Sequence, residues 1–199
     1  MVLLHPVMEV ILGIDPGTQI MGYSLICKSE GKPKLMLMDV LYLKKIVEMK
    51  LRIRQIYDKT QSIIDMYHPD HLAIEAPFFG KNVQSMLKLG RAQGVAIAAA
   101  MSRDLSWTEY EPATVKQTVT GKGNASKQQV ANILKSLFDF DDEPAYMDAT
   151  DALAIAYTCF IEQNNLLDEL RKGLKPQRKQ KGGRQNWADF VLQHPERKA

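Results

Sequence analysis

Four carboxylates lie beside apolar segments, where an ionised group without a partner costs free energy. Asp15 and Glu75 each end a short apolar run. Asp148 and Asp151 open an apolar, alanine-rich segment and are one helical turn apart, so they would share a helix face. Clustered acids repel one another unless a cation is present. Hard oxygen ligands suit Mg²⁺ or Mn²⁺, and paired divalent ions activate water in phosphodiester hydrolysis.

Each of these acids also has a simpler explanation. Asp15 precedes Pro16-Gly17, so it could be a turn former whose side chain bonds its own backbone. Glu75 could pair with a lysine, and Asp148 and Asp151 could cap a helix and complement its dipole. The convergence of four such acids favours a metal site. Their spacing alone is also compatible with a nucleotide-binding phosphotransferase.

Hydrophobic periodicity predicts the elements that must position these acids. The predicted strands are 9–15, 20–28, 32–43, 71–75 and 107–110, and the predicted helices are 48–67, 82–102, 112–119, 127–137 and 148–161. Three strands with short connections form an antiparallel meander, and a strand after a long helix implies a parallel crossover. The sequence therefore predicts an α/β domain with a mixed five-stranded sheet flanked by helices. A parallel pair of strands 9–15 and 71–75 would set Asp15 beside Glu75.

Two local patterns refine the predicted helices. Ser126 and Gln129 have capping-box spacing at the start of helix 127–137. Gly90, Gly94 and Ala98 fall on one face of helix 82–102, and such a face permits the close approach of another backbone. That backbone could belong to the sheet or to a second copy of the chain, and both alternatives stay open.

Composition is that of a cytosolic globular protein. The chain has 199 residues and a net charge of +3, which by itself gives no argument for nucleic-acid binding. No convincing signal peptide or membrane span is visible, and two cysteines without a C-x-x-C motif indicate reduced thiols, so we expect a cytoplasmic location. A composition shift predicts a globular domain at 1–165 and a flexible basic tail at 166–199, with a short docking helix at 186–192.

Five motifs in order resemble the RuvC family of bacterial Holliday junction resolvases. They are Gly13-Ile-Asp-Pro-Gly-Thr18, Ala73-Ile-Glu75, the segment 82–96, Pro112-Ala-x-Val-Lys-Gln-x-Val-x-Gly121 and Asp148-Ala-x-Asp-Ala-Leu-Ala-Ile-Ala156. The first motif is shared with sugar kinases and actin-like ATPases, but all five in order are specific. The resemblance implies the ribonuclease H-like fold, which agrees with the predicted order of elements.

The resemblance also implies a function and a cofactor. Asp15, Glu75, Asp148 and Asp151 match the four catalytic acids of the family. They are expected to bind two Mg²⁺ ions per active site, with Mn²⁺ as a substitute, for attack of water on a DNA phosphate. The expected products are symmetric nicks in two like-polarity strands of a four-way junction, with 5′-phosphate and 3′-hydroxyl ends. The implied assembly is a homodimer that acts with the RuvA–RuvB complex in recombination and DNA repair.

The resemblance further suggests DNA contacts. Phe78 matches an aromatic residue that stacks on a base near the crossover, although Phe79 could take that role and both rings could belong to the core. Lys116 and Lys127 match basic residues near the active site, and Lys81, Lys88 and Arg91 could extend the DNA-binding face. The alternative is that these lysines are merely solvated.

Three rival functions compete with junction cleavage. One is a nuclease of the same fold that acts on RNA–DNA hybrids or ribosomal RNA precursors. Another is an actin-like nucleotide-binding protein, which needs a second lobe for which 199 residues leave no room. The third is a junction-binding module without catalysis, which four acids facing phosphates argue against.

Overall fold

The computed structural model describes residues 9–77, 82–140 and 147–164. The elements are β1 Val10–Asp15, β2 Ile20–Ser29, β3 Lys32–Tyr42, α1 Met49–Tyr67, β4 His71–Glu75, α2 Val83–Met101, β5 Ser106–Tyr110, α3 Pro112–Thr120, α4 Lys127–Phe138 and α5 Met147–Gln163. Every strand and helix predicted within the described residues is present, with ends that shift by at most two residues, and the helix predicted at 186–192 lies outside them.

The sheet has the mixed topology that the sequence predicts. Its strand order is β3-β2-β1-β4-β5. β1, β2 and β3 pair antiparallel, whereas β1–β4 and β4–β5 are parallel. Ile14 pairs with Ile74 across the parallel β1–β4 ladder, so Asp15 and Glu75 follow at the same edge of the sheet. The predicted neighbourhood of these two acids is therefore confirmed.

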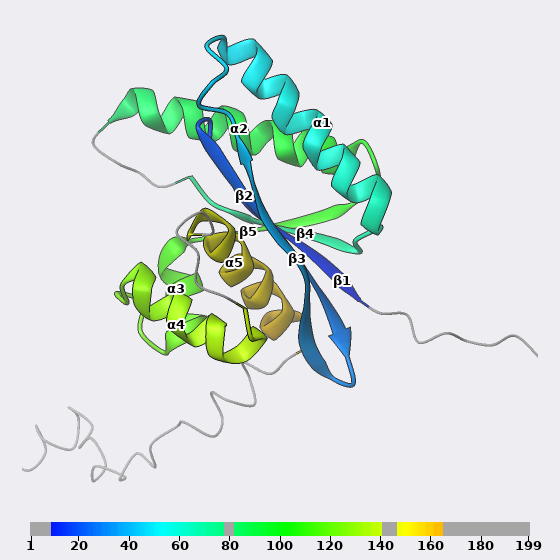
Figure 1. The fold of residues 1–199 in the computed structure, drawn as a ribbon, viewed down its shortest axis with the longest axis vertical. Helices are drawn as coiled ribbons and strands as arrows, with labels where there is room; N and C mark the ends of the chain where they lie inside the picture. Colours follow the sequence, from blue (N-terminus) through cyan, green and yellow to red (C-terminus); the bar gives the residue numbers. More distant parts are fainter. Residues whose placement is uncertain (1–8, 78–81, 141–146, 165–199) are drawn as a thin grey trace, which may run out of the picture. The chain divides into compact units, whose positions relative to one another are not determined.

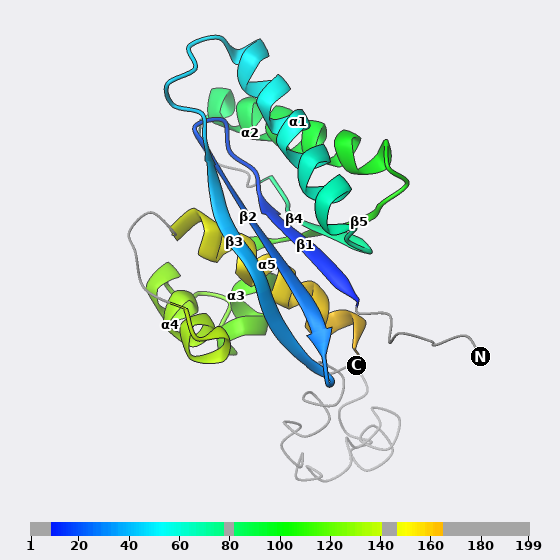
Figure 2. The same cartoon turned by 45° about the vertical axis from the view of Figure 1, so that its right-hand side comes forward.

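Helices cover both faces of the sheet (Figures 1 and 2). α1 and α2 lie on one face, and α3, α4 and α5 lie on the other. β1 is buried almost throughout because it is the middle strand between these two helical layers. A buried central strand whose last residue is a carboxylate places that carboxylate between the two layers.

Two strand glycines allow α5 to lie directly on the sheet. A Cβ atom at Gly13 would be 2.3 Å from the carbonyl oxygen of Ala152, and one at Gly22 would be 1.9 Å from that of Asp148. Because Gly22 pairs with Asp15 in the β1–β2 ladder, this contact sets the first turn of α5 beside the end of β1. Glycine is required at both positions by the close approach of two backbones.

The small-residue face of α2 does not contact the sheet. Gly94 and Ala98 are exposed, and a Cβ atom at Gly90 or Gly94 would meet nothing within 4 Å. The alternative in which this face packs on the sheet is therefore wrong. α2 reaches the core through a different row of residues, which contains Ala92, Ala96, Ala99 and Ala100. A symmetric dimer contact remains a prediction.

Other predictions have mixed outcomes. Cys27 and Cys159 are free and buried, as expected for reduced thiols. Among the described residues, no helix is both long enough and apolar enough to cross a membrane. The described residues up to 164 belong to one compact unit, and the domain boundary after residue 165 stays a prediction. The predicted tail, Phe78 and Lys81 lie outside the described residues, so the tail's flexibility and these two DNA contacts stay predictions.

Candidate active site

Three of the predicted acids meet at one end of the sheet. Asp15 ends β1, and Asp148 and Asp151 come from the first two turns of α5. One carboxylate oxygen from each of the three lies within 4.8 Å of the other two. The one-turn spacing of Asp148 and Asp151 makes both face the end of β1. The fold therefore brings acids that are distant in sequence together as a set of adjacent oxygen donors.

Glu75 lies on the flank of this set. It ends β4 next to Asp15, because β1 and β4 are parallel neighbours whose last residues lie at the same edge of the sheet. Its oxygens are not among the three that lie within 4.8 Å of one another. The amide of Gln93 donates to the Glu75 carbonyl oxygen at 3.1 Å and to the Glu109 carboxylate at 2.9 Å, which ties α2 to the end of β4.

Burial and mutual repulsion raise the pKa values of Asp15, Glu75 and Asp151. The pKa of Asp15 lies well above its ordinary value because of burial first, and then because of the negative charges of Glu75 and Asp151. Burial likewise raises the pKa values of Glu75 and Asp151, although Lys127 acts in the opposite direction on both. A bound cation would stabilise the ionised form of these neighbouring carboxylates, which burial and mutual repulsion disfavour. Because all donors are hard oxygens, the site fits Mg²⁺ or Mn²⁺.

Lys127 contributes a cation from α4. Its ammonium group pairs with the Asp151 carboxylate. The start of α4 is fixed by the predicted capping box: the Ser126 hydroxyl accepts from the Gln129 N–H at 3.2 Å, and the Gln129 side-chain oxygen accepts from the Ser126 N–H at 2.9 Å. Lys127 is the first residue after this cap, so the cap sets the direction from which its side chain reaches the acids.

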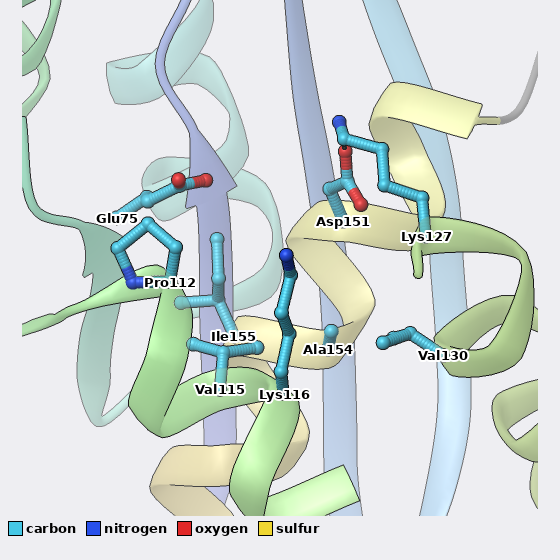
Figure 3. Close-up of a pocket in the computed structure, with 9 residues that line it drawn as sticks. All are labelled: Glu75, Pro112, Val115, Lys116, Lys127, Val130, Asp151, Ala154 and Ile155. Carbon is cyan, nitrogen blue, oxygen red and sulfur yellow. Dashed lines mark hydrogen bonds and ion pairs between the residues drawn. The ribbon is translucent and has the colours of Figure 1, made fainter. Parts of the chain in front are cut away.

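Lys116 approaches the same acids from α3. It lines a pocket of about 110 Å³ together with Glu75, Asp151 and Lys127. Figure 3 shows the amines of both lysines and the carboxylates of both acids at the same side of this pocket, above an apolar floor. The floor is formed by Pro112, Val115, Val130, Ala154 and Ile155. The pocket therefore offers positive charge beside the oxygen donors.

The turn after Asp15 is held from two sides. A Cβ atom at Gly17 would be 1.8 Å from the carbonyl oxygen of Ile20, so the turn closes tightly on itself. The Arg52 side chain donates to the carbonyl oxygens of Thr18 at 2.9 Å and Ile46 at 2.6 Å. The turn that orients Asp15 is thereby braced against α1.

Sequence reasoning missed two kinds of residue at this site. Gly13 and Gly22 lie within predicted strands, and a glycine inside a strand pattern is a usable signal of close backbone approach. Arg52 gave no such signal, because its hydrogen bonds join two loops that are distant along the chain. The four predicted acids, Lys116 and Lys127 are all brought to one region.

Comparisons with known proteins agree with this architecture. The family model "Crossover junction endodeoxyribonuclease RuvC" matches residues 11–159. RuvC of Bacteroides fragilis is 48% identical over 198 residues, which cover 98% of this chain and 99% of that protein. RuvC of Porphyromonas gingivalis is 45% identical over 197 residues, with coverage of 98% and 99%.

Solved structures show the same fold. T. thermophilus RuvC in complex with a Holliday junction substrate has a TM-score of 0.72 at 28% identity, over 79% of this chain and 96% of that chain. The yeast mitochondrial Holliday junction resolvase has a TM-score of 0.56 at 15% identity, over 82% of this chain and 83% of that chain, and supports the fold alone. The expected ribonuclease H-like fold is confirmed by these structures and by the strand order. The chain therefore belongs to the family of RuvC crossover junction endodeoxyribonucleases.

Proposed function

We propose that the chain is a Mg²⁺-dependent endonuclease that resolves four-way DNA junctions during recombination and repair. The observation that carries this proposal is the grouping of the Asp15, Asp148 and Asp151 oxygens beside a pocket lined by two lysines. The family membership of the chain supports junction DNA as the substrate, and the T. thermophilus relative was solved with a Holliday junction.

The chemistry follows from the donor set. Two Mg²⁺ ions bound by the acids, or Mn²⁺ in their place, would lower the pKa of the attacking water and stabilise the leaving oxygen. Asp15 is next to Glu75 at the ends of β1 and β4 and close to the two acids of α5, so it would hold the ions together with all three. Glu75 completes the donor set on the β4 side. In-line attack of water on a DNA phosphate then leaves a 5′-phosphate and a 3′-hydroxyl.

The lysines have a separate task. Lys116 and Lys127 present their amines on the same side of the pocket as Glu75 and Asp151, where a substrate phosphate would approach the acids. Lysine ammonium groups pair with phosphate as compact point charges. We assign both lysines to the phosphate next to the attacking water. Phe78 is proposed as a DNA contact on the motif match, and Lys81 is proposed as a DNA contact on its charge alone.

Symmetric cleavage of two strands calls for two active sites, so we propose a homodimer. α2 carries an exposed apolar row that includes Val83, Leu87 and Met101, which are 62%, 53% and 59% exposed. Gly90 and Gly94 lie within the same row and leave space for a close partner. A second copy of α2 is the partner that this row fits. RuvA–RuvB on the same junction, in the cytoplasm, completes the proposed assembly.

The decisive experiment uses a synthetic mobile four-way junction with Mg²⁺, with the products separated on a denaturing gel. We expect paired nicks at symmetric positions that DNA ligase can reseal. Asp15→Asn should bind the junction and fail to cut it, because it retains the shape of the site and loses one negative donor. Cleavage by Asp15→Asn, or cleavage of RNA–DNA hybrids alone by the wild type, would overturn the proposal.

The choice between the two adjacent phenylalanines needs its own comparison. Phe78→Ala and Phe79→Ala should be assayed on the same junction. A loss of cleavage confined to Phe78→Ala is expected, since loss of base stacking costs about 1–3 kcal/mol. A loss confined to Phe79→Ala would transfer the stacking role to Phe79.

A further inference from the structure

A second hollow adjoins the acids on the side of the sheet that α1 and α2 cover. It has a volume of about 460 Å³. It is lined by Asp15, Asp148, the turn 16–20, Lys44, Ser85, Lys88 and Leu89. None of these residues lines the pocket that contains Lys116 and Lys127. The pocket and the hollow are therefore lined by different acids of the same cluster.

The two lysines of this hollow have no ion-pair partner within the part of the chain that the structure describes. Lys44 and Lys88 are both exposed, and neither forms an ion pair among the residues that the structure describes. Lys127, by contrast, pairs with Asp151. Lys44 and Lys88 belong to different elements, the loop after β3 and the second turn of α2. Two unpaired cations from separate elements that converge on one hollow favour a shared anionic ligand.

The backbone around Lys44 is held in a fixed place relative to Asp15. The Leu43 N–H donates to the Gln19 carbonyl oxygen at 2.8 Å, and Leu43 itself is fully buried. Arg52 joins the same two loops through the carbonyl oxygens of Thr18 and Ile46. The loop that carries Lys44 and the turn that follows Asp15 therefore behave as one braced unit.

We propose that this hollow, named here the Lys44–Lys88 subsite, binds a phosphate of the cleaved DNA strand that neighbours the scissile phosphate. The inference rests on the proposed function. Lys116 and Lys127 hold the strand on the α3 and α4 side of the acids, whereas Lys44 and Lys88 hold it on the α1 and α2 side. Contacts on both sides would fix the scissile phosphate over Asp15, which is the positioning that hydrolysis needs.

The charges around the hollow favour a DNA strand that is already bound at the active site over a free phosphate ion. The carboxylates of Asp15 and Asp148 also line the hollow and would repel a free phosphate. A strand held at its scissile phosphate brings the neighbouring phosphate to the lysine side, at high effective concentration. The subsite is therefore expected to bind junction DNA in the presence of Mg²⁺ and not inorganic phosphate.

The first test is a salt titration of junction binding. Lys44→Gln, Lys88→Gln and the double variant are compared by fluorescence anisotropy in an Asp151→Asn background, which blocks cleavage and leaves the lining of the hollow intact. Each single variant should lower the slope of log K against log salt by about one unit and the double variant by about two. Lys45→Gln is the matched control, because Lys45 is also exposed and does not line the hollow. An unchanged slope in the double variant would overturn the subsite.

The second test locates the phosphate. Single methylphosphonates remove the charge of one phosphate at a time on either side of the cleavage position. We expect one neighbouring position at which neutralisation weakens binding by the parent protein and has no further effect in the double variant. Equal effects in both proteins at every position would contradict the subsite. Failure of the wild-type protein to cut the junction at all would instead overturn the proposed function.

Discussion

The carbonyl oxygen of Asp148 lies directly over Gly22, so close that a Cβ atom on Gly22 would be 1.9 Å away from it. Gly22 is in turn the residue that pairs with Asp15 across the β1–β2 ladder. The contact between a helix backbone and a strand backbone is what brings the acids of α5 to the acid of β1. The metal site thus depends on a residue that has no side chain.

Gly22→Ala should separate these acids. The added methyl group cannot avoid a backbone atom, so α5 must move away from β2, at a cost of about 1–3 kcal/mol in the free energy of unfolding. We expect loss of junction cleavage and weaker Mn²⁺ binding, measured by calorimetry. Ser24→Ala is a control on the same strand, since its hydroxyl is buried with no hydrogen-bond partner among the described residues and its loss should be tolerated. Normal Mn²⁺ binding by Gly22→Ala would contradict this account.

Stability without metal should depend on pH in a direction fixed by Asp15. Burial and the neighbouring acids raise the pKa of Asp15 in the folded state, so the folded protein retains a proton that the unfolded chain loses near pH 4. The free energy of unfolding in EDTA should therefore fall as the pH rises from about 4 through the raised pKa of Asp15.

Two comparisons by chemical denaturation check this pH dependence. Asp15→Asn should be more stable than the wild type at pH 7.5 in EDTA and should show a weaker fall with pH. Saturating Mg²⁺ should remove most of the difference, because a bound cation favours the ionised acids. A wild type that gains stability with rising pH in EDTA would show that Asp15 is not the dominant group.

Lys116 should contribute one phosphate contact. Lys116→Ala is expected to lower the slope of log K against log salt for junction binding by about one unit. Lys32→Ala is the control, because Lys32 is exposed at the β2–β3 turn, at the end of β2 remote from Gly22. An identical slope for wild type and Lys116→Ala would remove Lys116 from the DNA-binding surface.

The α2 row should control dimerisation. Leu87→Arg and Gly94→Arg place a charged side chain where a second α2 would pack, so both are expected to shift the protein to a monomer in sedimentation equilibrium. Met66→Arg on α1 tests whether any exposed apolar residue has this effect, since Met66 is 66% exposed and outside the row. Dimers that persist in both α2 variants would place the interface elsewhere.

Much of the site could be predicted from the sequence, because the patterns that locate its strands and helix starts span only a few residues. The alternation of apolar runs and turns located β1 and β4, and the crossover rule made them parallel neighbours, so the adjacency of Asp15 and Glu75 followed. The capping box at Ser126 was equally readable, and it placed Lys127 at the start of α4.

The face of α2 that meets the sheet could not be chosen in this way. Small residues line both sides of the helix, and only the packed structure shows that Gly94 is exposed while Ala96 is buried. Propensity and periodicity describe a helix by itself. The choice between two possible apolar faces depends on the elements that surround it.

The sequence by itself determined the elements, their order and the identity of the acids, because periodicity, turn residues and motif spacing act over short distances along the chain. The tertiary structure decided how close those acids come, through the contact of Gly22 with the backbone of Asp148. It also decided that Arg52 braces the turn after Asp15 and that Lys44 and Lys88 share a hollow. These relationships join residues far apart in sequence, and only the packing of α1, α2 and α5 on one sheet brings them together.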